Sequence, residues 1–430
     1  MTQNLACSRK RETMTDQTDQ STSLVALRGR VVTPDTVIDD GVVAWDRDTI
    51  IWVGDAAAQE APSSIREQLN DLKPSDDIII PGLVDVHCHG GGGESFPNAQ
   101  TPEQAMTAVT EHRAHGTTSL VASLVTADAQ TLKERAAMLA TLADRGELAG
   151  IHFEGPFVSH ERCGAQDPQF ICDPDPVLTA ELLDVAGGHA VTMTVAPEKP
   201  HASGEGSVAE VLREGGALPS WGHTDAEPDD VRAVFEDARG RYADQLKDPD
   251  HTRPLATVTH LFNGMKPMHH RDPGSIAEFL AAGARGDAVV EMICDGVHVN
   301  PTLVRCVYEV LGRSRCVFIT DAMAAAGMAD GSYQLGPQAV TVTDGIARLT
   351  DGGAIAGGTA HLLDCVRVAV GAGIPLVDAV FMASAQGARI LGDETVGALE
   401  VGKRADVVCL DSELHPLRVW RAGVVCDRNK

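Results

Sequence analysis

Basic residues are scarce in this sequence of 430 residues, which has 35 Lys and Arg against 61 Asp and Glu and a formal net charge of −26. Nucleic acids and anionic membranes bind to basic patches on protein surfaces. The acidic balance therefore argues against both as partners. It also means that an anionic substrate would have to be held by a few well-placed cations.

Long apolar runs and paired-cysteine motifs are also missing. No apolar run reaches the length of about 18 residues that a membrane-spanning helix needs, and residues 1–23 lack the apolar core of a signal peptide. The ten cysteines include no Cys-x-x-Cys pair and lack the spacing of a small disulfide scaffold, which indicates reduced thiols. We expect a soluble, cytoplasmic protein with a disordered N-terminal tail over residues 1–23.

The two ends of the remaining chain share one sequence pattern. Short alternating segments separated by turn residues occupy residues 23–32, 41–46 and 49–54, and they return at 405–410 and 419–426. This pattern predicts a small β-sandwich domain built from both termini, residues 24–80 and 393–430. A chain that is 43% hydrophobic can also bury a larger core, which we place in the inserted residues 81–392.

The inserted region alternates short apolar runs with helix-like segments. Eight such runs are expected as strands: 82–89, 117–126, 150–157, 190–196, 217–224, 255–262, 288–295 and 316–323. Helices are expected between and after them, at 102–115, 128–144, 208–214, 228–239, 275–282, 301–311, 360–371 and 377–391, with a β insertion at 333–349. Eight βα repeats predict a (β/α)8 TIM-type barrel, whose chemistry lies at the C-terminal ends of its strands.

Candidate metal ligands and a candidate base fall at those strand ends. The set comprises His87 and His89 in the first run, Glu154 in the third, His223 in the fifth, His260 in the sixth and Asp321 in the eighth. Residues at i and i+2 of a strand share a face, so His87 and His89 can bind one ion together. One barrel histidine alone is as well explained by a structural role. The whole set of imidazoles with a carboxylate is typical of a catalytic zinc-like site.

A divalent metal there would lower the pKa of water at the site to about 7. Asp321 is then the natural general base, since it can take a proton from the attacking water and return it to the departing amine. The alternative for Asp321 is a helix N-cap within Thr320-Asp321-Ala322.

Several motifs resemble known proteins. Pro-Gly-Leu-Val-Asp-Val-His-Cys-His-Gly at 81–90 resembles the opening signature of the amidohydrolase superfamily. His-Phe-Glu-Gly-Pro-Phe at 152–157, Gly-His-Thr at 222–224, Thr-His-Leu-Phe-Asn-Gly-Met at 259–265, Asp-Gly-Val-His at 295–298 and Thr-Asp-Ala-Met at 320–323 resemble N-acetylglucosamine-6-phosphate deacetylases. The resemblance covers most of residues 24–426. It implies metal-dependent hydrolysis of N-acetyl-D-glucosamine 6-phosphate to D-glucosamine 6-phosphate and acetate.

The resemblance also implies roles for individual residues. It makes Glu154, His223 and His260 the main metal ligands and Asp321 the base. It implies substrate contacts from Ala165, Gln166, Asn263, Gly264, Arg271 and His298. Members are typically homodimers, in which the residue matching His298 reaches the neighbouring subunit's phosphate site. Zinc is the expected metal, with Fe²⁺, Mn²⁺ and Co²⁺ as alternatives.

This chain departs from some family members in two ways. Some lack the paired histidines and hold one metal, whereas His87 and His89 are both kept here, so one metal or two bridged by Glu154 are both open. Where some members have Gly-x-His, this chain has Gly164-Ala165-Gln166, and glutamine cannot become cationic. Cys163 in the same loop is an ordinary loop thiol or, beside Arg162, a redox-sensitive one.

Two other functions are alternatives for this sequence. Cyclic-imide and dihydroorotate hydrolases commonly bridge two metals with a carbamylated lysine, where this chain carries Glu154. A catalytically inactive barrel that serves as a scaffold is the rival from another class. The retention of five candidate ligands together with Asp321 argues against a scaffold.

Overall fold

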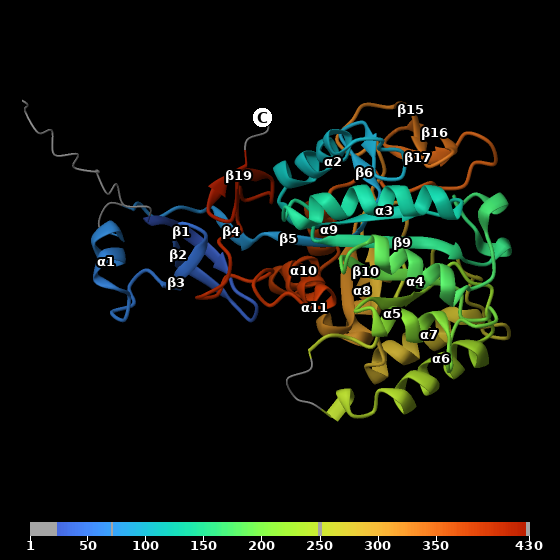
Figure 1. Cartoon of the computed structure of the whole chain (residues 1–430). Coiled ribbons are helices and arrows are strands. Elements are labelled where there is room, and N and C mark those ends of the chain that lie inside the picture. Colours follow the sequence, from blue (N-terminus) through green and yellow to red (C-terminus); the bar gives the residue numbers. More distant parts are fainter. Residues whose placement is uncertain (1–23, 70–71, 248–251, 427–430) are drawn as a thin grey trace, which may run out of the picture.

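The computed structural model describes residues 24–69, 72–247 and 252–426, in which a barrel with outer helices carries a smaller β domain at one side (Figure 1). The expected N-terminal tail, residues 1–23, lies outside the described residues. The β domain contains strands from both ends of the chain, and the barrel is formed by the residues between them.

An eight-stranded parallel sheet forms the barrel, as predicted, in the order β14-β13-β12-β11-β10-β9-β8-β5. Each expected run contains one strand: β5 (Leu83–Cys88), β8 (Thr117–Val125), β9 (Gly150–Phe157), β10 (Ala190–Val195), β11 (Leu218–Trp221), β12 (Ala256–Val258), β13 (Ala288–Ile293) and β14 (Cys316–Ile319). Every residue of these strands is buried, because helices cover one face and the barrel interior covers the other. Backbone bonds close the barrel beyond β5 and β14, from Asp321 N to His87 O (2.9 Å) and from His89 N to Ala322 O (2.7 Å).

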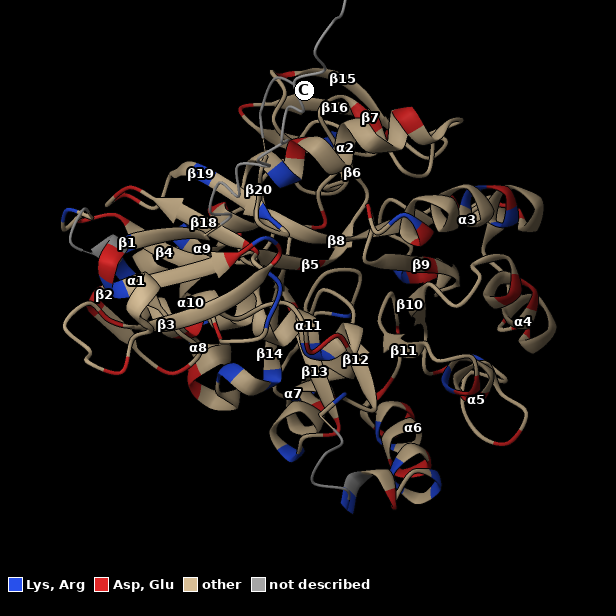
Figure 2. Ribbon diagram, turned by 60° about the vertical axis from the view of Figure 1, so that its left-hand side comes forward, with Lys and Arg blue, Asp and Glu red and all other residues tan. Residues whose placement is uncertain are grey.

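The helices that cover the barrel begin at residues suited to helix starts. Thr101 caps the first with its side chain and is followed by proline, and Asp128 caps the second. The helices are α2 (Pro102–Ala114), α3 (Ala129–Asp144), α4 (Pro176–Val185), α5 (Val208–Glu214), α6 (Pro228–Arg241), α7 (Gly274–Arg285), α8 (Pro301–Leu311), α9 (Leu362–Gly371), α10 (Leu376–Ala383) and α11 (Ala385–Leu391). Charged residues concentrate on these helices and on loops, whereas the barrel strands carry few (Figure 2).

The β domain is one mixed sheet in the order β20-β19-β18-β4-β1-β2-β3. Its strands are β1 (Leu24–Val32), β2 (Val37–Asp46), β3 (Thr49–Asp55), β4 (Ile78–Pro81), β18 (Val407–Leu410), β19 (Pro416–Arg421) and β20 (Val424–Val425), and a helix, α1 (Ser63–Leu69), follows β3. β2 and β19 are four strand positions apart in this order, which would separate them by about 19 Å in a flat sheet. The rings of Trp45 and Trp420 nevertheless lie 5.5 Å apart, so the sheet curls over a shared core.

Several expectations about individual elements were incomplete. Residues 419–426 are not one strand, because Ala422 and Gly423 adopt left-handed φ angles of 49° and 75° that turn the chain between β19 and β20. The short strand β4 and the helices α1 and α4 were not predicted, and the helix expected at 377–391 is divided at Ser384 into α10 and α11. Asp175, which caps α4, and Pro176 at its first position are the signal that could have found that helix.

The expected β insertion is present as a three-stranded antiparallel sheet, β15 (Gly331–Leu335), β16 (Gln338–Thr343) and β17 (Ile346–Leu349). Its apolar residues, among them Leu335 and Val340, pack with Val125 of β8 and Met323 beyond β14. This insertion therefore lies over the C-terminal rim of the barrel. In the part of the chain that the structure describes, no helix has the length and hydropathy to cross a membrane.

Candidate metal centre and active site

The structure brings all six predicted ligand and base residues together at the C-terminal rim of the barrel. His87 and Glu154 lie in β5 and β9, and the other four follow directly after β5, β11, β12 and β14. Their side chains form two groups that could each hold a metal ion, and both groups include Glu154. The convergence arises because the C-terminal ends of parallel barrel strands meet at one rim.

The first group, the His223 subsite, consists of Glu154, His223 and His260. Glu154 Oε1 lies 3.0 Å from Nε2 of His223 and 2.8 Å from Nε2 of His260, and the two imidazole nitrogens are 3.1 Å apart. His223 Nδ1 donates to the backbone oxygen of Arg162 at 2.8 Å. With one proton held on Nδ1, Nε2 of His223 can offer its lone pair to a cation bound beside Glu154.

The second group, the His87 subsite, consists of His87, His89, Glu154 and Asp321. His89 Nε2 lies 3.1 Å from Glu154 Oε2 and 3.2 Å from Asp321 Oδ1. His87 Nε2 is 3.2 Å from His89 Nε2 and 3.6 Å from Asp321 Oδ1. Oε1 of Glu154 lies closest to His223 and His260 and is also 3.6 Å from His87 Nε2, whereas Oε2 lies closest to His89, so Glu154 borders both subsites.

The donor set fits divalent cations. Nδ1 of His87 lies 3.2 Å from Glu291 Oε2 and Nδ1 of His89 lies 3.2 Å from the backbone oxygen of Ser123, so each ring can keep a proton on Nδ1 and offer Nε2 to a metal ion. Two unprotonated nitrogens facing each other at 3.1–3.2 Å repel unless a proton or a metal ion lies between them. Two zinc–nitrogen bonds of about 2.0–2.1 Å that meet at a tetrahedral angle place the nitrogens about 3.3 Å apart. The observed spacings therefore suit metal binding.

Backbone strain is concentrated at the same residues. His223, His260 and Asp321 have φ angles of 46°, 25° and 48°, in the left-handed region that non-glycine residues rarely adopt. Phe262, two residues beyond His260, has φ 85°. Strained conformations persist where the surrounding structure fixes them, and they cluster at functional sites.

Several supporting polar residues were not singled out from the sequence. Glu291 Oε2 accepts from Nδ1 of His87 and, at 3.3 Å, from the backbone N–H of His260, so one buried carboxylate orients ligands of both subsites. Asp85 accepts from the Thr320 hydroxyl at 2.6 Å, and burial raises the pKa of Asp85 to about 6. A charged residue within the apolar strand β13 was the available signal for Glu291.

The carboxylates of the site are ionised. Burial raises the pKa of Asp321, but the hydrogen bond with His89 and the charge of His87 outweigh it and lower that pKa to about 2. Burial likewise opposes ionisation of Glu154, yet hydrogen bonds from His223, His260 and His89 hold its pKa well below the usual value. Asp321 is therefore a carboxylate at neutral pH, as a general base must be.

A cavity of about 270 Å³ opens beside these residues. Five of the six predicted substrate residues line it: Ala165, Gln166, Asn263, Gly264 and His298. Arg271 does not. Leu335, Ala354, Ile355 and Gly357 complete the wall and were not predicted, because nothing in the sequence showed where the β insertion would pack.

Comparisons with known proteins agree with this geometry. The sequence profile of the amidohydrolase family matches residues 78–427. The chain belongs to the amidohydrolase family. N-acetylglucosamine-6-phosphate deacetylase from Bacillus subtilis (strain 168) is 32% identical over 404 residues, which cover 89% of this chain and 92% of that protein. N-acetylgalactosamine-6-phosphate deacetylase from Escherichia coli O157:H7 is 31% identical over 377 residues, covering 86% and 91%.

A solved structure is similar over nearly the whole chain. It is that of a mutant N-acetyl-D-glucosamine-6-phosphate deacetylase from Mycobacterium smegmatis in complex with N-acetyl-D-glucosamine-6-phosphate. The two chains are 36% identical with a TM-score of 0.82, and the match covers 94% of this chain and 99% of the other.

Gln166 of this amidohydrolase supports the candidate metal ligand Glu154. Its Nε2 donates to Glu154 Oε2 at 2.5 Å, and its Oε1 accepts from the backbone N–H of Thr126 at 2.7 Å. Both ends of the amide are therefore engaged, and the expected contact of Gln166 with substrate stays a prediction. Gly264 has φ 59°, and a Cβ there would lie 2.7 Å from His223 Nδ1, so the backbone approaches the site closely only with glycine.

The two cations expected to bind phosphate lie in different surroundings. His298 lines the cavity of its own chain, and its Nδ1 lies 2.7 Å from Asp295 Oδ2. Burial lowers the pKa of His298, but the hydrogen bond to Asp295 and the charge of that carboxylate raise it more, so its pKa lies above the usual value. Arg271 is exposed in the loop before α7, where its Nη1 lies 2.7 Å from His270 Nε2.

Cys163 does not line the cavity. Burial raises its pKa, and its neighbour Arg162 is paired with Asp225 at 2.7 Å. These surroundings favour the thiol over the thiolate, as in an ordinary loop cysteine.

Proposed function

We propose that this amidohydrolase hydrolyses the acetamide bond of N-acetyl-D-glucosamine 6-phosphate, giving D-glucosamine 6-phosphate and acetate for amino-sugar catabolism and cell-wall sugar recycling. The observation that carries the proposal is the convergence of Glu154, His223, His260 and Asp321 beside a cavity of monosaccharide size. The names of relatives that align over most of the chain support the choice of substrate.

We propose that Glu154, His223 and His260 hold the essential divalent metal, with zinc as the expected ion and Fe²⁺, Mn²⁺ and Co²⁺ as alternatives. His87 and His89, with the second oxygen of Glu154, would hold a second ion, so we propose one or two per subunit. A divalent cation in these subsites would supply Lewis acidity toward the amide carbonyl and toward water.

Different side chains of the site transfer protons, contact the sugar and bind the phosphate. Asp321 takes the proton of the attacking water and delivers it to the nitrogen of the departing amine, so one carboxylate serves both proton transfers. Asn263 and Gly264 line the cavity where the sugar would lie. Asp295 raises the pKa of His298 above its usual value in spite of burial, which favours the charged imidazolium that suits a phosphate.

We propose a homodimer in which a cation of one subunit completes the phosphate site of the other. The family resemblance gives this role to His298. However, His298 lines the cavity of its own chain, whereas Arg271 is exposed outside it. The geometry therefore favours Arg271 as the residue that reaches across, and His298 as one that acts in its own subunit.

An activity panel tests the proposed function. Acetate release is measured from phosphorylated and unphosphorylated N-acetylglucosamine, N-acetylgalactosamine and N-acetylmannosamine, with zinc, iron, manganese or cobalt added to metal-free protein. We expect N-acetylglucosamine 6-phosphate to give the highest kcat/KM and chelation to remove activity. A preference for another sugar phosphate would identify that compound as the substrate instead. If no acetate were released with any metal, the protein would be a catalytically inactive barrel.

A further inference from the structure

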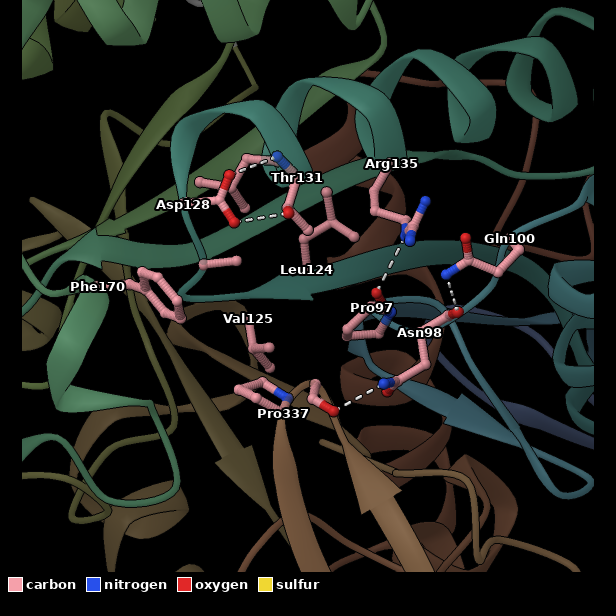
Figure 3. Close-up of a pocket in the computed structure, with 13 residues that line it drawn as sticks. Pro97, Asn98, Gln100, Leu124, Val125, Asp128, Thr131, Arg135, Phe170 and Pro337 are labelled. Atoms are coloured by element: carbon pink, nitrogen blue, oxygen red, sulfur yellow. Dashed lines mark hydrogen bonds between the residues drawn. The ribbon is translucent and has the colours of Figure 1, made fainter.

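A second cavity lies outside the barrel, next to the active site but separate from its lining (Figure 3). It is bounded by β8, the start of α3, residues 97–100, and the Gly336–Pro337 turn between β15 and β16. Its volume of about 290 Å³ is close to the 270 Å³ of the active-site cavity. It can therefore hold a molecule as large as the proposed substrate.

Two opposite charges border this cavity on one face of α3. Asp128 and Arg135 are seven residues apart, which is two helical turns or about 10 Å along the axis. Arg135 Nε donates to the backbone oxygen of Pro97 at 3.2 Å, and no carboxylate of the described residues pairs with its guanidinium. Its outer nitrogens are thus available to an anion.

Asp128 is held as a carboxylate. The hydroxyl and backbone N–H of Thr131 donate to it at 2.7 and 3.0 Å, and these bonds lower its pKa. Each oxygen keeps a further lone pair for a cationic donor.

Part of the surface between the two charges is apolar, beside the polar side chains of Asn98, Gln100 and Thr131 that also line the cavity. Leu124, Val125, Phe170 and Pro337 line it, and Phe170 lies at the Asp128 end, away from Arg135 (Figure 3). An aromatic ring and aliphatic side chains offer a surface on which the C–H face of a sugar ring can pack, while the flanking charges fix its orientation. The cavity thus combines one cation, one anion and an apolar wall.

We propose that this cavity is a second, non-catalytic binding site for an amino-sugar phosphate, with the phosphate at Arg135 and the ammonium at Asp128. The identity of the ligand rests on the proposed function, whose product carries these two groups on one ring. The acetylated substrate carries no ammonium, so the site distinguishes product from substrate.

Adjacent residues of the same turn and strand line this cavity and shape the active site. Leu335 lines the active-site cavity, whereas its neighbours Gly336 and Pro337 line this one. Val125 packs with Leu335, and the next residue, Thr126, holds Gln166. A bound product would therefore contact the same turn and strand that shape the active site.

Isothermal titration of the metal-loaded protein with glucosamine 6-phosphate tests the site, using Arg135→Gln and Asp128→Asn. Asparagine is a good N-cap, so Asp128→Asn removes the charge and keeps the start of α3. Arg145→Gln is the matched control, because Arg145 is exposed at the other end of α3. We expect a binding event that Arg135→Gln weakens by about tenfold or more and that the control leaves unchanged.

Related probes and an activity assay complete the test. Glucose 6-phosphate and glucosamine should each bind this site more weakly than glucosamine 6-phosphate, and Asp128→Asn should remove the difference between the two phosphates. All three variants should keep the wild-type kcat and KM for acetate release. Equal binding by wild type and a folded Arg135→Gln overturns the proposal. Binding that depends on Arg135 without any deacetylation would instead refute the proposed function and keep the site.

Discussion

Replacing Asp321 with asparagine should abolish nearly all turnover while the fold and the His223 subsite persist. Asparagine is the right substitution because Asp321 has φ 48°, a conformation that asparagine tolerates better than alanine does. The backbone bond from residue 321 to His87 O can remain. The variant therefore removes the ability to accept a proton without removing the turn that closes the barrel.

The expected loss follows from the two proton transfers that Asp321 performs. General acid–base catalysis contributes about 10²–10⁴-fold, and one carboxylate here serves both the attack of water and the departure of the amine. We therefore expect kcat to fall by about 10⁴-fold, which is about 5.4 kcal/mol in the activation barrier. KM should change little, because binding depends on other residues of the cavity.

Steady-state acetate release, metal analysis and thermal unfolding form the assay. Asp344→Asn is a matched control, since Asp344 also has a positive φ (51°) but lies exposed in the β16–β17 turn. That control should retain wild-type kcat and Tm. A kcat within tenfold of wild type for folded, metal-loaded Asp321→Asn would refute the assignment of Asp321 as the base.

Further predictions concern the second metal, the phosphate site and pH. Replacing His87 with Gln and His89 with Asn should leave reduced but measurable activity, whereas complete inactivity of the folded, metal-replete variant would make that subsite essential. Arg271→Ala should lower kcat/KM for the phosphorylated sugar by about 30-fold, the equivalent of about 2 kcal/mol, and an equal loss with the unphosphorylated sugar would remove Arg271 from the phosphate site. Activity should recover when Arg271→Ala subunits form mixed dimers with Asp321→Asn subunits, and it should not recover when His298→Ala subunits do so. Recovery with His298→Ala would instead support the role across the interface that the family resemblance implies for His298. The carboxylate of Asp295 outweighs burial and raises the pKa of His298. The positive charge of His298 is therefore present below that pKa and lost above it. KM for the phosphorylated sugar should therefore rise as pH increases through that pKa, and a His298→Gln variant that shows the same rise would contradict this.

Most elements of the fold could be predicted from local sequence patterns. Each barrel strand lies in a short, largely apolar run bounded by turn residues, and that signal does not depend on distant contacts. The strands that were missed or not separated are short or depend on partners. β4 pairs with β1 and with β18 from the far end of the chain, and β20 is two residues long. Burial of Trp45 against Trp420 could not be foreseen from either segment alone.

The candidate site shows the same division. His87, Glu154 and Asp321 could be placed from the sequence because strand ends of a barrel converge by geometry. The cavity wall contributed by Leu335 depends on how the β insertion packs over the rim, which local pattern does not encode. The family resemblance implied a substrate contact for Arg271, but Arg271 is exposed and does not line the cavity of its own chain.

Quantitative product analysis tests the central claim most directly. Metal-loaded wild-type protein is incubated with N-acetylglucosamine 6-phosphate, and acetate and glucosamine 6-phosphate are both counted by nuclear magnetic resonance, alongside Glu154→Gln. We predict equal amounts of the two products from the wild type and at least about 10³-fold slower formation by the variant, because Glu154 serves both subsites. Absence of acetate from the metal-loaded wild type, or equal rates for the two proteins, would contradict the account.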